Sequence, residues 1–121
     1  MNILSQLIVG FIALLHLYIL WLEMFAWTTH GRKVFKNIPE DQFDKTKVMA
    51  ANQGLYNGFL AAGLIWSLCI TDVDWSKNTA IFFLSCVLIA GVYGTMTASK
   101  RIFFVQAAPA ILGLLSFMLQ I

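Results

Sequence analysis

Residues 3–27 read ILSQLIVGFIALLHLYILWLEMFAW, an apolar run that decides the fold. About 20 such residues suffice to cross a bilayer as one helix, so the run predicts a transmembrane helix. It nevertheless carries His16 and Glu23, and no other position predicted at membrane depth holds an acid or a base. Because an ionisable side chain inside a membrane is costly, Glu23 is the first candidate functional residue.

The composition extends this prediction to the whole chain. Of 121 residues, 60% are hydrophobic and 12% are charged, and the mean hydropathy is +0.77, which is too apolar for an ordinary soluble domain. No basic residue precedes the first run and no small-x-small cleavage site follows it, so we interpret it as a mature helix and not as a signal peptide. We predict an all-α fold: an integral membrane four-helix bundle forming a single transmembrane domain over residues 1–121, with helices at about 3–27, 39–70, 78–98 and 102–120.

The basic residues predict the orientation. Only Lys77 lies at the second predicted loop, whereas seven basic residues lie in or beside the first and third loops: Arg32, Lys33, Lys36, Lys45, Lys47, Lys100 and Arg101. Since cytoplasmic loops are enriched in Lys and Arg, both termini are expected outside. So strong a bias opposes insertion in both orientations and favours a monomer or a parallel homodimer. The small net charge of +2 predicts the lipid bilayer as partner and no nucleic acid.

The first predicted loop, residues 28–46, is too polar for lipid and too short for a domain. We expect Arg32, Lys33 and Lys36 to reach anionic lipid headgroups while neighbouring apolar residues rest at the interface. Pro39 is followed by two acidic residues, as is typical of a helix N-terminus. The second helix is therefore predicted to begin near Pro39.

The motif ANQGLYNG at residues 51–58 is the densest polar signal in the chain. Its polar side chains share a helical arc of about 140 degrees: Asn52, Gln53, Tyr56 and Asn57. A stripe of small residues beside them would let another helix approach closely: Gly54, Gly58 and Ala62. The third predicted helix carries a similar pair, Ala90 and Gly94. The pattern leaves open whether these stripes pack within one subunit or between two.

Depth along the helices, counted at about 1.5 Å per residue from their cytoplasmic ends, predicts two polar levels. The first level holds Glu23, Asn52, Gln53, Tyr93 and Gln106, and the deeper one holds His16 and Asn57. Trp27 shares an inward helix face with His16 and Glu23. We predict that these residues, together with Tyr56, line a cytoplasm-facing polar pocket around Glu23. Pro109 is expected to interrupt the last helix beside Gln106.

Several chemistries are not predicted by this sequence. The chain has no Glu-x-x-His pair, no cluster of Cys and His, no phosphate-binding glycine loop after a strand, and no Ser-His-Asp set. Neither a metal nor a cofactor is therefore expected.

A family resemblance involves the same segments. These are HLYIL at 16–20, LEMFAW at 22–27, ANQGLYNGFLAAG at 51–63, GVYG at 91–94 and FVQAAP at 104–109. With them the whole chain resembles domain-of-unknown-function family 1304 (DUF1304), small bacterial membrane proteins. The resemblance implies a four-helix, multi-pass protein of the bacterial cytoplasmic (inner) membrane, and it brings no established activity.

Three functions are compatible with the predicted pocket. The first is binding or transport of a small hydrophobic or cationic molecule, with Glu23 as counter-ion or proton carrier. The second is a cofactor-free membrane enzyme, an isomerase or hydrolase, that uses Glu23 as general acid or base. The third is an accessory subunit in which Glu23 only forms interhelical hydrogen bonds. We rank them in this order.

Overall fold

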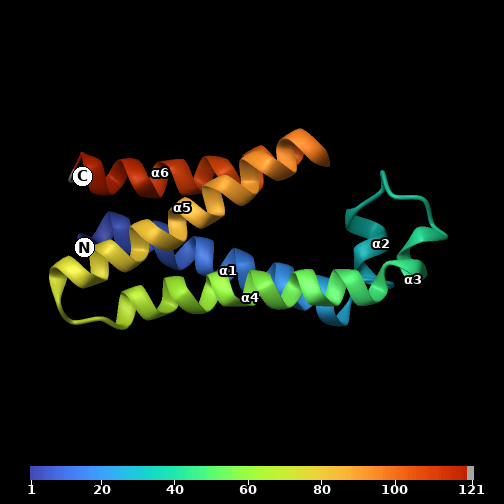
Figure 1. Ribbon diagram of the computed structural model, residues 1–121, viewed down its shortest axis with the longest axis horizontal. Helices are drawn as coiled ribbons and strands as arrows, with labels where there is room; N and C mark the ends of the chain where they lie inside the picture. Colours follow the sequence, from blue (N-terminus) through green and yellow to red (C-terminus); the bar gives the residue numbers. More distant parts are fainter. Residues whose placement is uncertain (120–121) are drawn as a thin grey trace. The chain divides into compact units, whose positions relative to one another are not determined.

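The computed structural model describes residues 1–119 (Figure 1). The elements are α1 (Ile3–Phe25), α2 (His30–Val34), α3 (Gln42–Lys45), α4 (Lys47–Cys69), α5 (Val73–Thr97), the π-helix η1 (Phe103–Ala107) and α6 (Ala108–Met118). Helices make up 82% of the structure, and the described residues contain no strand. The predicted all-α class is confirmed.

The chain divides into two compact units. Unit 1 comprises Met1–Leu14 and Leu60–Ile121, and unit 2 comprises Leu15–Phe59. Both α1 and α4 therefore contribute residues to each unit.

Unit 1 has an apolar core to which four helices contribute. Its fully or nearly fully buried side chains are Val9, Ile12, Ala13, Leu64, Ala80, Leu84, Val87, Ala110 and Phe117. Hydroxyl groups join helices at its edge: Ser5 Oγ and Ser116 Oγ are 2.8 Å apart, and Ser76 Oγ donates to the Ser67 carbonyl across 2.7 Å. These bonds satisfy polar groups that would otherwise be buried alone.

The last two helices of unit 1, α5 and α6, pack along each other (Figure 1). Asp72 caps α5 by accepting a hydrogen bond from the Trp75 amide, so this helix begins at Val73, before the predicted start near residue 78. Between α5 and α6, the Ala108 amide bonds the Phe103 carbonyl, which is the π-helical pattern. This irregular turn lies directly before Pro109, which cannot donate a backbone hydrogen bond. The predicted end of the last helix at Gln120 lies outside the described residues.

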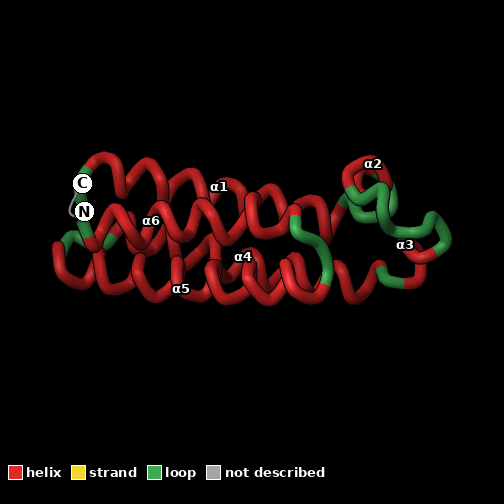
Figure 2. Tube along the Cα trace, turned by 90° about the horizontal axis from the view of Figure 1, so that it is seen from above, coloured by secondary structure: helices red, strands yellow, loops and turns green. Residues whose placement is uncertain are grey.

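Unit 2 contains the two short helices, with loops around them (Figure 2). The helix predicted from Pro39 appears as α3 and α4, and one residue, Thr46, separates them. The Thr46 hydroxyl donates to the Gln42 carbonyl across 2.8 Å. Such bonding to the backbone of the preceding turn bends helices, which accounts for the interruption.

Two helices are long and apolar enough to cross a membrane, namely α1 and α5. This finding rests on length and composition. The segment Phe103–Met118 is also apolar but shorter. Of the four predicted spans, the described chain thus supplies two that meet this criterion.

Candidate functional site

The buried face of α1 carries both of its ionisable residues. His16 and Glu23 are seven residues apart, which is two helical turns, so they lie on the same side of the helix. The side chain of His16 is 0% exposed and that of Glu23 is 5% exposed. Large apolar residues occupy the opposite side, so the polar pair points into the protein.

The Glu23 carboxyl group has a hydrogen-bond partner on α4. The Asn57 side-chain amide, Nδ2, donates to Glu23 Oε1 across 2.9 Å. The same nitrogen donates to the Gln53 carbonyl across 3.0 Å. Asn57 therefore uses both of its amide hydrogens, one to hold its own orientation on α4 and one to hold Glu23.

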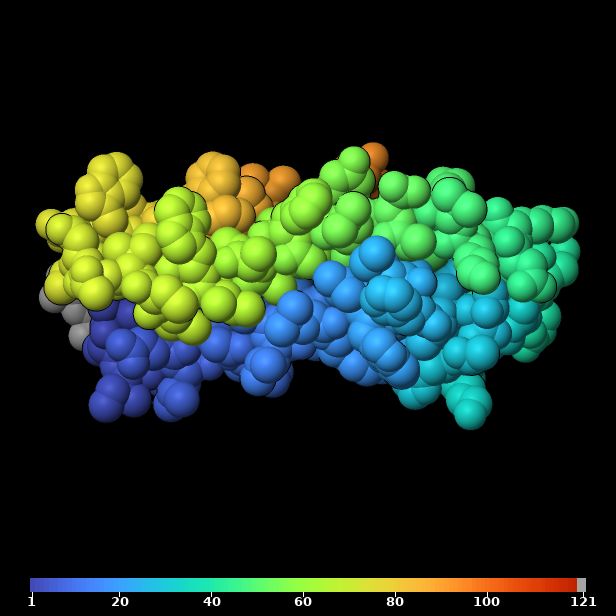
Figure 3. Space-filling view, turned by 90° about the horizontal axis from the view of Figure 1, so that it is seen from below, coloured from blue at the N-terminus to red at the C-terminus, as the bar shows by residue number. Residues whose placement is uncertain are grey.

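Two glycines let α4 approach α1 at this point. A Cβ atom on Gly54 would lie 2.9 Å from Met24 Cγ, 3.0 Å from Glu23 Cβ and 3.2 Å from the Leu20 carbonyl oxygen. A Cβ atom on Gly58 would lie 2.5 Å from Leu20 Cδ1. Gly54 and Gly58 thus pack against α1 of the same chain. In Figure 3 the blue segment of α1 and the green segment of α4 in unit 2 lie side by side.

The charge of Glu23 has no basic partner among residues 1–119. The ion pairs there join Arg32 to Glu40 and Asp44, and Lys45 to Asp41. Asn57 is also the only described residue that donates a hydrogen bond to the Glu23 carboxyl group, and it reaches Oε1. The remaining oxygen, Oε2, can accept a bond from a ligand or hold a proton.

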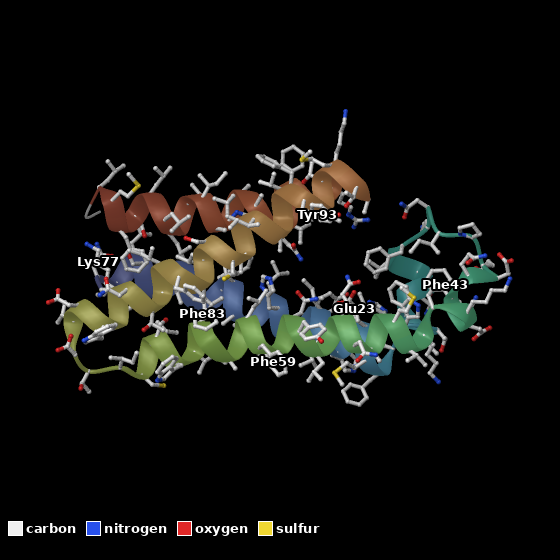
Figure 4. The ribbon with its side chains drawn as sticks, in the orientation of Figure 1. Glu23, Phe43, Phe59, Lys77, Phe83 and Tyr93 are labelled. Atoms are coloured by element: carbon white, nitrogen blue, oxygen red, sulfur yellow. The ribbon has the colours of Figure 1, made fainter. Side chains whose placement is uncertain are left out.

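Trp27, one turn beyond Glu23, anchors the segment that follows α1. Its Nε1 donates to Thr46 Oγ1 across 3.0 Å, and its ring centroid lies 5.4 Å from that of Phe35 and 5.2 Å from that of Phe43. Phe43 is buried, and Figure 4 places it among the short helices of unit 2, away from Glu23. Trp27 therefore contributes to the fold of residues 28–46.

Five other residues predicted to line the pocket are exposed or half-buried. Asn52, Gln53 and Tyr56 are exposed, and the Asn52 amide donates to the Val48 carbonyl of its own helix. Tyr93 is exposed on α5, and Gln106 is half-buried in η1; both belong to unit 1. Within unit 2, the structure brings together Glu23, Asn57 and Gly54 from the predicted set.

Of the small residues predicted to pack in unit 1, some are exposed and one lies against a neighbouring side chain. Ala62 and Ala90 are exposed, whereas a Cβ atom on Gly94 would lie 3.1 Å from Ile102 Cγ2. The sequence reasoning missed Gly91, which is buried; a Cβ atom there would lie 2.8 Å from the Ala107 nitrogen. The sequence does contain a signal for this packing role: Gly91 lies three residues before Gly94, so both glycines fall on one side of a helix.

The chemistry that this site can perform follows from its donors and acceptors. It offers one carboxyl group, one amide that is already bonded, and a buried imidazole at His16. Residues 1–119 contain no group of three or more His, Cys, Asp and Glu side chains that could hold a metal ion. The arrangement suits recognition of a single positive charge or exchange of a proton.

Comparison with known proteins gives a family and a relative. The sequence model of a family described as "Protein of unknown function (DUF1304)" matches residues 10–118. The chain is 29% identical over 118 residues to the uncharacterized protein YpaA of Lactococcus lactis subsp. lactis (strain IL1403), an alignment that covers 96% of this chain and 98% of that protein. No solved structure matches the chain.

Proposed function

The chain belongs to the DUF1304 family of proteins of unknown function, and we propose that it is a multi-pass membrane protein that binds or transports a small hydrophobic or cationic molecule at Glu23. Membrane location is the first part of this proposal and ligand binding is the second. Each part has its own support.

The exposure of the apolar helices supports membrane location. Within the apolar windows of α1 and α5, only 28% and 22% of residues are buried, whereas the core helix of a soluble protein is mostly buried. Exposed large side chains recur every three or four residues along all of α1: Ile3, Leu7, Phe11, Leu14, Tyr18, Trp21 and Phe25. Such a surface is unfavourable in water and costs nothing against lipid tails.

We further propose a four-helix bundle in the bacterial cytoplasmic membrane, with both termini outside. The distribution of Lys and Arg along the chain supports this orientation. It places residues 28–46 and the α5–η1 connection on the cytoplasmic side. It also places Glu23, near the end of α1, close to the cytoplasmic surface.

One observation carries the ligand proposal: the buried Glu23 carboxyl group is held by the neutral Asn57 amide and by no basic residue among 1–119. An uncompensated carboxylate in an apolar setting is costly, so a cation or a proton stabilises it. A single carboxylate suits a monovalent cation better than a metal ion, which prefers several oxygen ligands. Leu20 and Met24 beside the site favour a ligand with an apolar body.

Binding of a lipophilic monocation tests the proposal. Tetraphenylphosphonium would be titrated by calorimetry into protein in detergent, with Glu23→Gln as the test variant and Glu40→Gln as the matched control. Glutamine at position 23 can still accept the Asn57 bond, so the fold should persist. We expect binding to be lost in Glu23→Gln and kept in Glu40→Gln, whose side chain is exposed.

Equal binding by both variants would overturn the role of Glu23. Absence of binding by the unaltered protein would overturn the proposed ligand class. A Glu23→Gln variant that binds normally but is less stable would assign the Glu23–Asn57 bond to helix packing alone.

A further inference from the structure

Three polar aromatic side chains form a cluster at the C-terminal end of α1. The Tyr18 hydroxyl lies 3.1 Å from His30 Nε2, and the ring centroid of Trp21 lies 6.0 Å from that of Tyr18 and 5.5 Å from that of His30. Tyr18 and Trp21 are exposed, and His30 is half-buried. This aromatic cluster holds the first residue of α2 against the exposed side of α1. Tyr and Trp are enriched where a membrane meets water.

Two basic residues that closely follow His30 in the sequence take part in no ion pair among residues 1–119. Lys33 is three residues from His30, so the two share one side of α2, and Lys36 follows two residues after the helix. Both lysines are exposed, and neither takes part in an ion pair with residues 1–119.

The acidic residues of this segment are already engaged with other basic residues. Glu40 and Asp44 pair with Arg32, and Asp41 pairs with Lys45. Arg32 also donates to the Thr28 and Glu40 carbonyls and lies over the Phe43 ring. Arg32 is therefore engaged in the fold of residues 28–46, and its contact with lipid stays a prediction. The charge available to a partner belongs to Lys33 and Lys36.

We propose that Lys33, Lys36 and the aromatic cluster bind the headgroup of an anionic phospholipid. The two ammonium groups would pair with the phosphate, and the hydroxyl and imidazole of Tyr18 and His30 would supply hydrogen bonds. Trp21 and the exposed apolar side of α1 would receive the upper acyl chain. This apolar surface beside the charge favours a lipid over a soluble phosphate. The inference rests on the proposed membrane location and is independent of ligand binding at Glu23.

Native mass spectrometry tests this inference. The protein would be purified in mild detergent and supplied with equal amounts of phosphatidylglycerol and phosphatidylethanolamine. The test variant is Lys33→Gln with Lys36→Gln, and the control is Lys45→Gln with Lys77→Gln, which changes the net charge equally. We expect the preference for phosphatidylglycerol to fall about fivefold per lysine, and about thirtyfold in the double test variant. The control should keep the preference.

Other arms of the experiment separate the alternatives. Tyr18→Phe changes no charge, and it should weaken the preference several-fold if the hydroxyl contacts the headgroup; an unchanged preference would overturn the role of the aromatic cluster. Equal losses in the test and control variants would reduce the effect to net charge and overturn the site. Displacement of the lipid by millimolar inorganic phosphate would assign the site to free phosphate.

Failure of this inference can be told from failure of the proposed membrane location. Carbonate extraction of membranes containing each variant reports insertion separately. Resistance to extraction without a lipid preference would overturn only the lipid site, whereas full extraction would overturn the membrane location and the lipid site with it.

Discussion

The side-chain amide of Asn57 donates to Glu23 Oε1 across 2.9 Å, and Gly54 lies opposite Glu23 at the same contact between α1 and α4. The bond is made by two side chains that are 34 residues apart in the sequence. It can form because the missing side chain at position 54 lets the helix backbones approach. The close packing and the hydrogen bond therefore depend on each other, and each can be tested separately.

Removal of the amide tests the hydrogen bond. Asn57→Ala leaves the buried Glu23 carboxyl group without its described donor, so we expect a loss of about 1–3 kcal/mol in the free energy of unfolding. The measurement is unfolding by SDS in mixed micelles, followed by circular dichroism. Asn52→Ala is the control, because the exposed Asn52 amide bonds only its own helix, and it should change stability by less than about 0.5 kcal/mol. Similar losses in both variants would contradict the specific role of Asn57.

Addition of one methyl group tests the close approach. In Gly54→Ala the new Cβ atom meets the Leu20 carbonyl oxygen at 3.2 Å, and backbone cannot move aside as a flexible side chain can. We expect destabilisation of about 1–3 kcal/mol. Gly10→Ala is the matched control, because its Cβ atom would meet only Leu68 Cδ1, at 4.0 Å. It should gain about 0.5–1 kcal/mol from its better helix propensity. A Gly54→Ala protein as stable as the unaltered one would contradict the close approach of α4 to α1 at this position.

Arg32 provides a local prediction. Its guanidinium group donates to the Thr28 carbonyl across 2.6 Å and to the Glu40 carbonyl across 2.8 Å, and it pairs with Asp44 at 3.2 Å. Lysine cannot reproduce this fork of donors. In Arg32→Lys we expect amide hydrogen exchange in residues 28–46 to become several-fold faster, with unchanged exchange in α5. Arg32→Lys keeps the positive charge and removes only these bonds, whereas the control Lys33→Gln removes a neighbouring positive charge that makes none of them, so it should leave exchange unaffected. Equal acceleration in the two variants would contradict the assignment.

The paired hydroxyls of unit 1 allow a double-mutant cycle. Ser5 Oγ and Ser116 Oγ are 2.8 Å apart and buried. Ser5→Ala and Ser116→Ala should show a coupling free energy of about 0.6 kcal/mol, which is the average for side-chain hydrogen bonds in membrane helices. The same SDS unfolding assay measures it. Additive losses, with no coupling, would mean that the two hydroxyls do not bond each other.

The inward side of α1 could be predicted from the sequence. The spacing of seven between His16 and Glu23 places both on one side of a helix, and both are buried. The all-α class could also be predicted, since apolar runs of this length form helices. Helical periodicity is a property of a single helix, so the buried side of α1 can be predicted without knowing which helices pack against it.

The partner of Glu23 was not predictable by the same means. Residue counting placed Asn57 one level deeper, beside His16, because it assumes that all helices start at one surface and stand upright. Tilt and register depend on contacts such as those of Gly54, which residue counts do not contain. The role of Arg32 was missed for a similar reason: a charge count does not say which basic residue finds a carboxylate. The inclusion of Tyr93 and Gln106 in the pocket stays a prediction.

Above all, we propose that Glu23 receives a small molecule or ion inside a membrane protein. The most direct test is an experimental structure of the protein purified from its native membrane in mild detergent. We predict non-protein density within hydrogen-bond distance of the Glu23 carboxyl group, on the oxygen that Asn57 does not bond, and loss of that density in Glu23→Gln. A Glu23 carboxyl group enclosed only by protein side chains, with no density beside it, would contradict the claim.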